Sequence, residues 1–124
     1  MATTILCIDD SKVSRAFIKK GLKEILSKST ISIEEASNAR DAFALCQVKT
    51  YDFITLDLTM PDMNGYDFLA ALKEKAIKQK IIVLTADIQP LAEKTVMDLG
   101  ASGYLEKPFD NELMLALLKK IGAV

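Results

Sequence analysis

The sequence predicts an α/β fold in which a parallel β-sheet lies between two layers of helices. Five short apolar runs, each too short to form a helix, alternate along the chain with segments whose apolar residues recur at helical spacing. This alternation is typical of parallel sheets, because the crossover between two parallel strands is usually a helix. The chain has 124 residues, half of them hydrophobic, which is enough for one domain with its own core.

The five apolar runs are the expected strands. Most are flanked by polar or turn residues and are apolar throughout, as strands buried on both faces are. The second run is more polar, so we expect it at an edge of the sheet. The expected strands cover residues 5–8, 32–34, 53–56, 81–84 and 104–105.

The segments between these strands carry helix signals. Ser11 and Asp110 are suitable N-cap residues for the first and last helices. The segment 90–99 has a proline near its start and Gly100 just past its end, the asymmetry expected of a helix. The positions that we expect to face the sheet are Val13, Phe17, Gly21, Leu22 and Ile25; Ala42, Leu45, Cys46 and Lys49; Tyr66, Leu69, Ala70 and Leu72; and Leu113, Met114, Leu117, Leu118 and Ile121.

Composition and charge exclude several classes of function. The chain has 16 basic and 17 acidic residues, so its net charge of −1 gives no reason to expect nucleic acid or a membrane as a partner. The chain begins with nothing like a signal peptide and contains no apolar stretch of roughly 18 residues, so we expect a cytoplasmic protein. The absence of histidine excludes a histidine-based triad and a phosphohistidine carrier. We expect Cys7 and Cys46 to be buried thiols in a reducing compartment.

Polar residues follow the expected strands at the points where the chain leaves the core. The first run ends in Asp9 and Asp10, the third in Asp57, the fourth in Thr85 and the fifth in Lys107. Ligands of open parallel sheets bind at the carboxyl ends of the strands. With the flavodoxin-like, doubly wound strand order 2-1-3-4-5, the first and third strands are neighbours, and the three aspartates would converge there.

The residue types at this edge predict a divalent cation and a carboxylate that can react. Three neighbouring carboxylates repel one another unless a cation is present, and Lys107 supplies only one positive charge. Oxygen ligands without cysteine or histidine favour Mg²⁺, with Mn²⁺ as the other candidate. Because Mg²⁺ usually takes one or two carboxylates, one is left to act as a nucleophile. With a lysine and a hydroxyl, these are the groups needed for aspartyl-phosphate chemistry.

The segments around these residues resemble the response-regulator receiver family, in particular its single-domain CheY-like members. The matching segments are residues 8–11, 56–65, 83–86 and 100–109. The resemblance extends from the first strand to the last helix, so it implies one receiver domain over residues 1–124 and no output domain. It implies five strands and five helices.

The resemblance also implies the roles of the acidic residues. Asp57 would accept a phosphoryl group from a histidine kinase or a small-molecule donor, and would itself be a Mg²⁺ ligand. Asp10 would ligate Mg²⁺ directly, Asp9 mainly through water, and Thr59 through its backbone carbonyl. Thr59 and Asp87 occupy positions that the family uses to tune hydrolysis of the aspartyl phosphate, and we hypothesise that this pair sets the phosphoryl lifetime.

Further residues would couple the phosphoryl group to a change of shape. By resemblance, Lys107 would pair with the phosphoryl oxygens, and the Thr85 hydroxyl would move to hydrogen-bond the same group. Tyr104 would then swing inward as a rotamer switch. The Lys107–Pro108 peptide bond would be cis.

The resulting hypothesis is a phosphorylation-controlled interaction switch, in chemotaxis or motility. It implies a CheA-like histidine kinase, a downstream target such as a flagellar motor switch component, a phosphatase as an optional partner, and a monomeric chain that is not an enzyme towards other substrates. A phosphorelay shuttle or phosphate sink would have the same site. A haloacid-dehalogenase-like phosphatase needs a second aspartate where this chain has Thr59, and in a flavodoxin-type flavin binder Asp9 and Asp10 would repel the phosphate.

Overall fold

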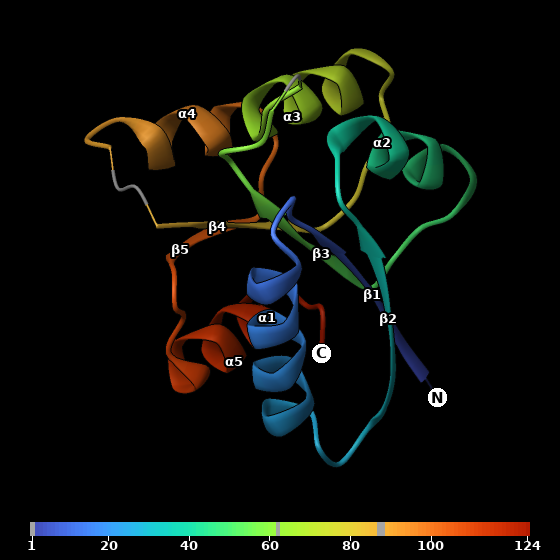
Figure 1. The fold of residues 1–124 in the computed structure, drawn as a ribbon, viewed down its shortest axis with the longest axis vertical. Coiled ribbons are helices and arrows are strands. Elements are labelled where there is room, and N and C mark those ends of the chain that lie inside the picture. The colour runs from blue at the N-terminus through green and yellow to red at the C-terminus, as the bar shows by residue number, and fades with distance from the viewer. Residues whose placement is uncertain (1, 62, 87–88) are drawn as a thin grey trace.

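The computed structural model describes residues 2–61, 63–86 and 89–124, in which five strands alternate with five helices (Figure 1). All neighbouring strands are parallel, and their order in the sheet is β2-β1-β3-β4-β5. The predicted fold class and strand order are therefore confirmed. The elements are β1 (Ala2–Ile8), α1 (Lys12–Ile25), β2 (Thr30–Ala36), α2 (Ala39–Val48), β3 (Phe53–Asp57), α3 (Gly65–Glu74), β4 (Ile81–Thr85), α4 (Ala92–Asp98), β5 (Gly103–Glu106) and α5 (Asn111–Lys120).

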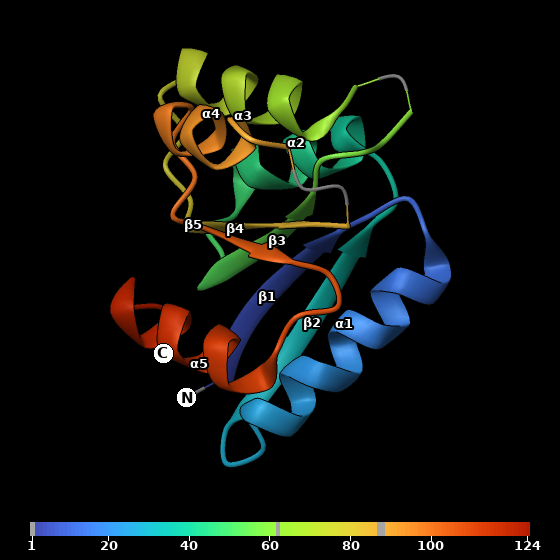
Figure 2. The same ribbon diagram turned by 90° about the vertical axis from the view of Figure 1, so that its left-hand side faces the viewer.

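The helices form one layer on each face of the sheet (Figure 2), with α1 and α5 on one side and α2, α3 and α4 on the other. Because side chains alternate along a strand, β1 contributes to both layers. Ile5 and Cys7 pack with α1 and α5, whereas Leu6 and Ile8 pack with the opposite helices. The buried sheet thus separates two hydrophobic cores.

The second strand is longer than the predicted residues 32–34. Strand β2 has seven residues, each paired with one residue of β1. Backbone hydrogen bonds do not depend on the side chain, so the pairing extends past the apolar positions. The predicted place of this strand at the edge of the sheet is confirmed.

The buried faces of the helices differ from the prediction at several positions. In α1, Val13 and Phe17 are 66% and 70% exposed, whereas Leu22 is buried as predicted. Ile18, which was not predicted, is also buried in this core. Positions 13, 17 and 21 form a second stripe at helical spacing, which lies beside the Phe109 ring rather than beneath the sheet. Leu113 of α5 and Ala70 of α3 were also expected to face inward and are exposed.

The end of α4 follows the predicted pattern better than its start. The helix begins at Ala92, so Pro90 precedes it instead of opening it. Gly100 has φ +101°, and the hydrogen bonds Gly100 N–H to Met97 O and Ala101 N–H to Val96 O close a Schellman motif.

Within the described residues, no helix combines the length and apolar character needed to cross a membrane. Cys7 and Cys46 are buried, and burial raises the pKa of both thiols to about 11.

Candidate functional site

The carboxyl ends of four strands bring the predicted residues to one edge of the sheet. Asp9 follows β1, Asp57 ends β3, Thr85 ends β4 and Lys107 follows β5. One carboxylate oxygen from each of Asp9, Asp10 and Asp57 lies within 4.8 Å of the other two. Asp9 and Asp57 are buried and Asp10 is exposed. The convergence expected from the strand ends is therefore present in the structure.

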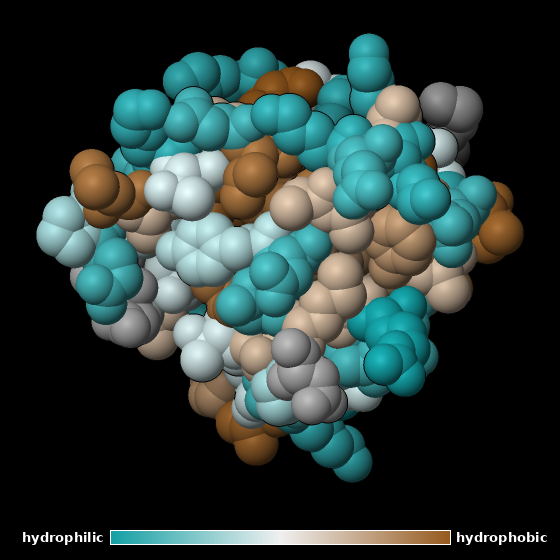
Figure 3. Space-filling model, turned by 90° about the horizontal axis from the view of Figure 1, so that it is seen from above, coloured by the Kyte–Doolittle hydropathy of each residue, from teal (hydrophilic) through white to brown (hydrophobic). Residues whose placement is uncertain are grey.

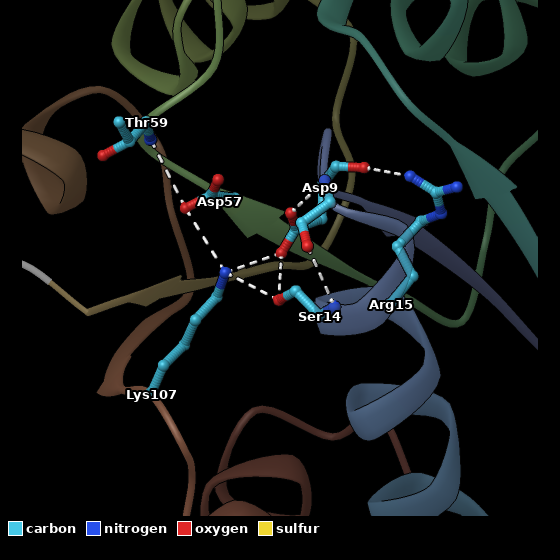
Figure 4. Close-up of polar contacts among 7 residues, drawn as sticks. Asp9, Ser14, Arg15, Asp57, Thr59 and Lys107 are labelled. Carbon is cyan, nitrogen blue, oxygen red and sulfur yellow. Dashed lines mark hydrogen bonds and ion pairs between the residues drawn. The ribbon is translucent and has the colours of Figure 1, made fainter.

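Asp9 is the most enclosed of the three carboxylates, with 1% of its surface exposed. Its Oδ1 accepts a hydrogen bond from the Ser11 backbone N–H at 2.9 Å. Its Oδ2 accepts from the Ser14 hydroxyl at 2.6 Å and from Lys107 Nζ at 2.6 Å (Figure 4). Arg15 donates to the Asp9 carbonyl oxygen at 2.6 Å. The first turn of α1 therefore holds Asp9 in one orientation.

Lys107 reaches this site from the end of β5. Its backbone N–H donates to the Thr85 carbonyl at 2.8 Å, and its peptide bond to Pro108 is cis. Its ammonium lies between two carboxylates, 2.6 Å from Asp9 Oδ2 and 3.5 Å from Asp57 Oδ1. In this structure Lys107 is thus the cation that neutralises the acidic cluster in part.

The surroundings of Asp57 disfavour the charged form of its carboxyl group. Burial raises the pKa of Asp57 above its ordinary value; Lys107 and the Thr59 N–H oppose this, and the charges of Asp9 and Asp10 add to it. The Thr59 N–H donates to Asp57 Oδ1 at 3.3 Å. Three carboxylates, one lysine and oxygen ligands alone fit a small divalent cation such as Mg²⁺.

The loop after β3 is held close to Asp57 by a glycine. A Cβ on Gly65 would lie 2.8 Å from the Asp57 carbonyl oxygen and 2.8 Å from Leu58 Cα. The Gly65 N–H donates to the Leu58 carbonyl at 3.0 Å, and Asn64 caps α3 by accepting from the Asp67 N–H at 3.0 Å. The start of α3 therefore lies against the end of β3.

The expected switch residues occupy different depths. Thr85 is 1% exposed at the end of β4. Tyr104 lies beside Val83 in the β4–β5 pairing, is half-buried, and packs against the core of the α2, α3 and α4 side. The prediction for Asp87 falls outside the described residues.

Two residues of the site were not predicted from the sequence. Ser14 and Arg15 both lie in the first turn of α1 and contact Asp9. A helical side chain leans towards the N-terminus of its helix, so a serine three residues after the Ser11 cap can reach back to the strand end. That spacing is the signal that could have indicated Ser14.

A doubly wound five-stranded sheet with an acidic cluster and a lysine at its carboxyl edge defines the receiver class of signalling domains. The family model for the response regulator receiver domain matches residues 5–119, so this chain belongs to that family and is a receiver domain of a two-component response regulator. Receiver domains interact with histidine kinases and downstream effectors, and they are signalling proteins rather than classical enzymes.

Individual relatives agree with this assignment. The chemotaxis protein CheY of Thermotoga maritima is 31% identical over 122 residues, 98% of each chain. The nitrate/nitrite response regulator protein NarL of Escherichia coli is 34% identical over 97% of this chain, which spans only 55% of NarL. The solved structure of Vibrio cholerae CheY4 has a TM-score of 0.80 and 28% identity, and the alignment covers 98% and 99% of the two chains.

Proposed function

We propose that this chain is a phosphoacceptor switch in which Asp57 receives a phosphoryl group. The observation that carries this proposal is the position of the Asp57 carboxylate, buried at the end of β3. One of its oxygens lies 3.5 Å from Lys107 Nζ, and one lies within 4.8 Å of a carboxylate oxygen of Asp9 and of Asp10. A carboxylate placed among other carboxylates and a lysine is suited to nucleophilic attack on phosphorus.

The transfer needs a donor that brings its own leaving group. An oxygen of Asp57 attacks the phosphorus of a phosphohistidine on a kinase or of an acyl phosphate, and a P–O bond forms. The P–N or P–O bond to the donor breaks, and its electron pair leaves with the imidazole or the acetate.

The acidic cluster has the ligands for a magnesium ion. Asp10 and Asp57 would hold it directly, Asp9 through water, and Thr59 through its backbone carbonyl, with Mn²⁺ as a substitute. When bound, the ion would neutralise negative charge shared by the carboxylates and the phosphoryl oxygens. Lys107, already 3.5 Å from Asp57, would donate to a phosphoryl oxygen.

The response would pass through Thr85 and Tyr104. The Thr85 hydroxyl would move to hydrogen-bond the phosphoryl group, and Tyr104 would turn inward into the space that this movement opens, which biases a two-state element. A partner protein that recognises this change would bind the face formed by α4, β5 and α5, where Leu91, Met97 and Leu113 are exposed. Figure 3, which views the molecule from the side of α2, α3 and α4, shows hydrophobic side chains scattered among hydrophilic ones.

The proposal extends to the signalling pathway in which this switch acts. The likeness to CheY proteins over nearly the whole chain supports chemotaxis or motility, with a CheA-like kinase, a flagellar motor switch component as target and a phosphatase that ends the signal. Thr59 and Asp87 would set the phosphoryl lifetime. A phosphorelay shuttle or phosphate sink would share the site. Thr59, in place of the second aspartate of haloacid-dehalogenase phosphatases, disfavours that class.

Acetyl phosphate and Mg²⁺ test the proposal directly. After incubation, mass spectrometry of the intact chain should find one added phosphoryl group, and the adduct should be absent from Asp57→Asn and from samples with EDTA. Asp52→Asn is the matched control, because Asp52 is an exposed aspartate just before β3, and this variant should be phosphorylated like the parent chain. An adduct that persists in Asp57→Asn, or release of phosphate from unrelated esters with turnover, would contradict the proposal.

A further inference from the structure

Ser14 lies between the two oppositely charged groups of the site. Its hydroxyl donates to Asp9 Oδ2 at 2.6 Å and accepts from Lys107 Nζ at 3.0 Å. Lys107 also donates to the same Asp9 oxygen at 2.6 Å. The three side chains therefore form a closed triangle of hydrogen bonds, to which α1, the end of β1 and the end of β5 each contribute one member.

This triangle fixes the direction of the ammonium. A lysine ammonium carries three N–H donors on a flexible four-carbon stem, so one partner alone leaves it free to rotate. Two of its donors are directed to Asp9 and Ser14. Figure 4 shows Asp57 on the side of the ammonium away from Ser14, and the Nζ–Oδ1 distance of 3.5 Å leaves the third donor directed there.

We propose that Ser14 is a positioning residue for phosphoryl transfer, whose hydroxyl orients the Lys107 ammonium so that one N–H faces the oxygen-bearing end of Asp57. The inference rests on the proposed function and adds to it a residue that helps set the rate. A group already directed at the place where charge develops needs no reorganisation during the reaction. A chain without this hydroxyl has to order the lysine as the phosphoryl group arrives.

Ser14 has a simpler role from which this one must be separated. Its hydrogen bond to Asp9 satisfies a buried carboxylate whether or not Lys107 is present. If that were its whole role, the loss of the hydroxyl would have the same effect with and without the lysine. A double-mutant cycle between Ser14 and Lys107 distinguishes the two roles.

The experiment measures the rate constant of phosphorylation by acetyl phosphate over a range of donor concentrations. For Ser14→Ala we expect a loss of about tenfold in the rate constant at saturating donor, the size of one hydrogen bond to a charged group. The half-saturating donor concentration should stay the same, and Ser14→Thr should recover most of the rate. In a Lys107→Met background, Ser14→Ala should change the rate less than twofold.

A second measurement follows the ammonium itself and needs no phosphorylation. In ¹⁵N NMR spectra, the Lys107 Nζ–H signal should exchange slowly with water in the parent chain and in Ser14→Thr, and rapidly in Ser14→Ala. An Nζ–H signal or a phosphorylation rate that is unchanged in Ser14→Ala would overturn the role of Ser14. An equal loss of phosphorylation rate on Ser14→Ala in the parent chain and in the Lys107→Met background would also overturn it. Failure of the parent chain to take up phosphoryl would instead overturn the proposed function, and the NMR result would still decide whether Ser14 orients Lys107.

Discussion

Lys107 Nζ lies 2.6 Å from Asp9 Oδ2, so an ion pair joins the ends of the first and fifth strands across 98 positions of the sequence. The strands β3 and β4 lie between β1 and β5 in the sheet, and Lys107 Nζ also lies 3.5 Å from Asp57 Oδ1 at the end of β3. Asp9 is almost fully buried and the Lys107 side chain is 17% exposed. A pair this enclosed is costly to break, because its remaining charge stays desolvated.

Removal of the lysine should therefore destabilise the chain in the absence of metal. For Lys107→Met in EDTA we expect a loss of about 2–4 kcal/mol in the free energy of unfolding, measured by urea denaturation. Millimolar Mg²⁺ should restore part of this loss, because a bound cation neutralises the same carboxylates. Lys20→Met, an exposed change on α1, should shift stability by less than about 0.5 kcal/mol. Equal losses in the two variants would contradict this account of the ion pair.

The raised pKa of Asp57 predicts the direction of a pH effect. The folded chain holds the Asp57 proton more tightly than the unfolded chain, whose carboxyl keeps its ordinary pKa near 3.8. In the window above that value the folded state binds more protons, so stability contributed by this group falls as pH rises through the folded pKa. In EDTA at neutral pH, Asp57→Asn should unfold at higher urea concentration, by on the order of 1 kcal/mol.

The same variant should lose the response to magnesium. Mg²⁺ should stabilise the parent chain and stabilise Asp57→Asn much less, since one ligand has become neutral. Thermal unfolding at several pH values, with and without Mg²⁺, measures both effects. The stability difference between Asp57→Asn and the parent chain in EDTA should be smaller at pH 4 than at pH 7. If the difference were the same at both pH values, the raised pKa of Asp57 would not be its cause.

Gly65 should tolerate a methyl group much less well than Gly21. At Gly65 the added Cβ would lie 2.8 Å from backbone atoms of residues 57 and 58, which cannot turn away. At Gly21 it would lie 2.7 Å from the outer end of the Phe109 ring, which can move, and alanine also favours the helix. We expect Gly65→Ala to cost about 2 kcal/mol and slow phosphorylation, and Gly21→Ala to change stability by less than about 1 kcal/mol. Urea denaturation and the acetyl phosphate assay measure both, and similar costs would contradict the prediction.

The sheet and the location of the site could be predicted because both depend on local sequence. Each buried strand is a short apolar run, and each run ends in a polar residue where the chain leaves the core. In a parallel sheet all such ends fall at one edge. The convergence of Asp9, Asp57 and Lys107 therefore required only the strand assignments and the strand order.

The details that could not be predicted depend on packing between distant elements. In α1, two stripes with helical spacing lie side by side, one with Val13 and Phe17 and one with Ile18 and Leu22. Which side chains are buried depends on how α1 packs against both the sheet and α5, and the predicted Leu22 is buried together with Ile18. Likewise, the pairing of Lys107 with Asp9 and Ser14 depends on the distances between β1, α1 and β5. The strand β5 is far from the other two elements in the sequence.

The ends of three helices offer a final prediction, on stability alone. The helices α3, α4 and α5 all end in a Schellman motif, with its central residue at positive φ. That residue is Gly100 after α4 and Gly122 after α5. After α3 it is Ala76, with φ +57°. The left-handed region costs an L-residue with a Cβ roughly 1–2 kcal/mol, and glycine avoids this cost. Ala76→Gly should therefore stabilise the chain by about 0.5–1 kcal/mol, after the larger backbone entropy of glycine in the unfolded chain is subtracted.

Gly100→Ala is the matched control, because a Cβ there would meet no atom within 4 Å and the change tests the backbone alone. It should destabilise the chain by about 1 kcal/mol, so the two substitutions should shift the urea midpoint in opposite directions. Both sites lie outside the acidic cluster, and the rate of phosphorylation by acetyl phosphate should be unchanged in both variants. If Ala76→Gly lowered stability, the entropy of the unfolded chain would outweigh the relief of backbone strain at this helix end.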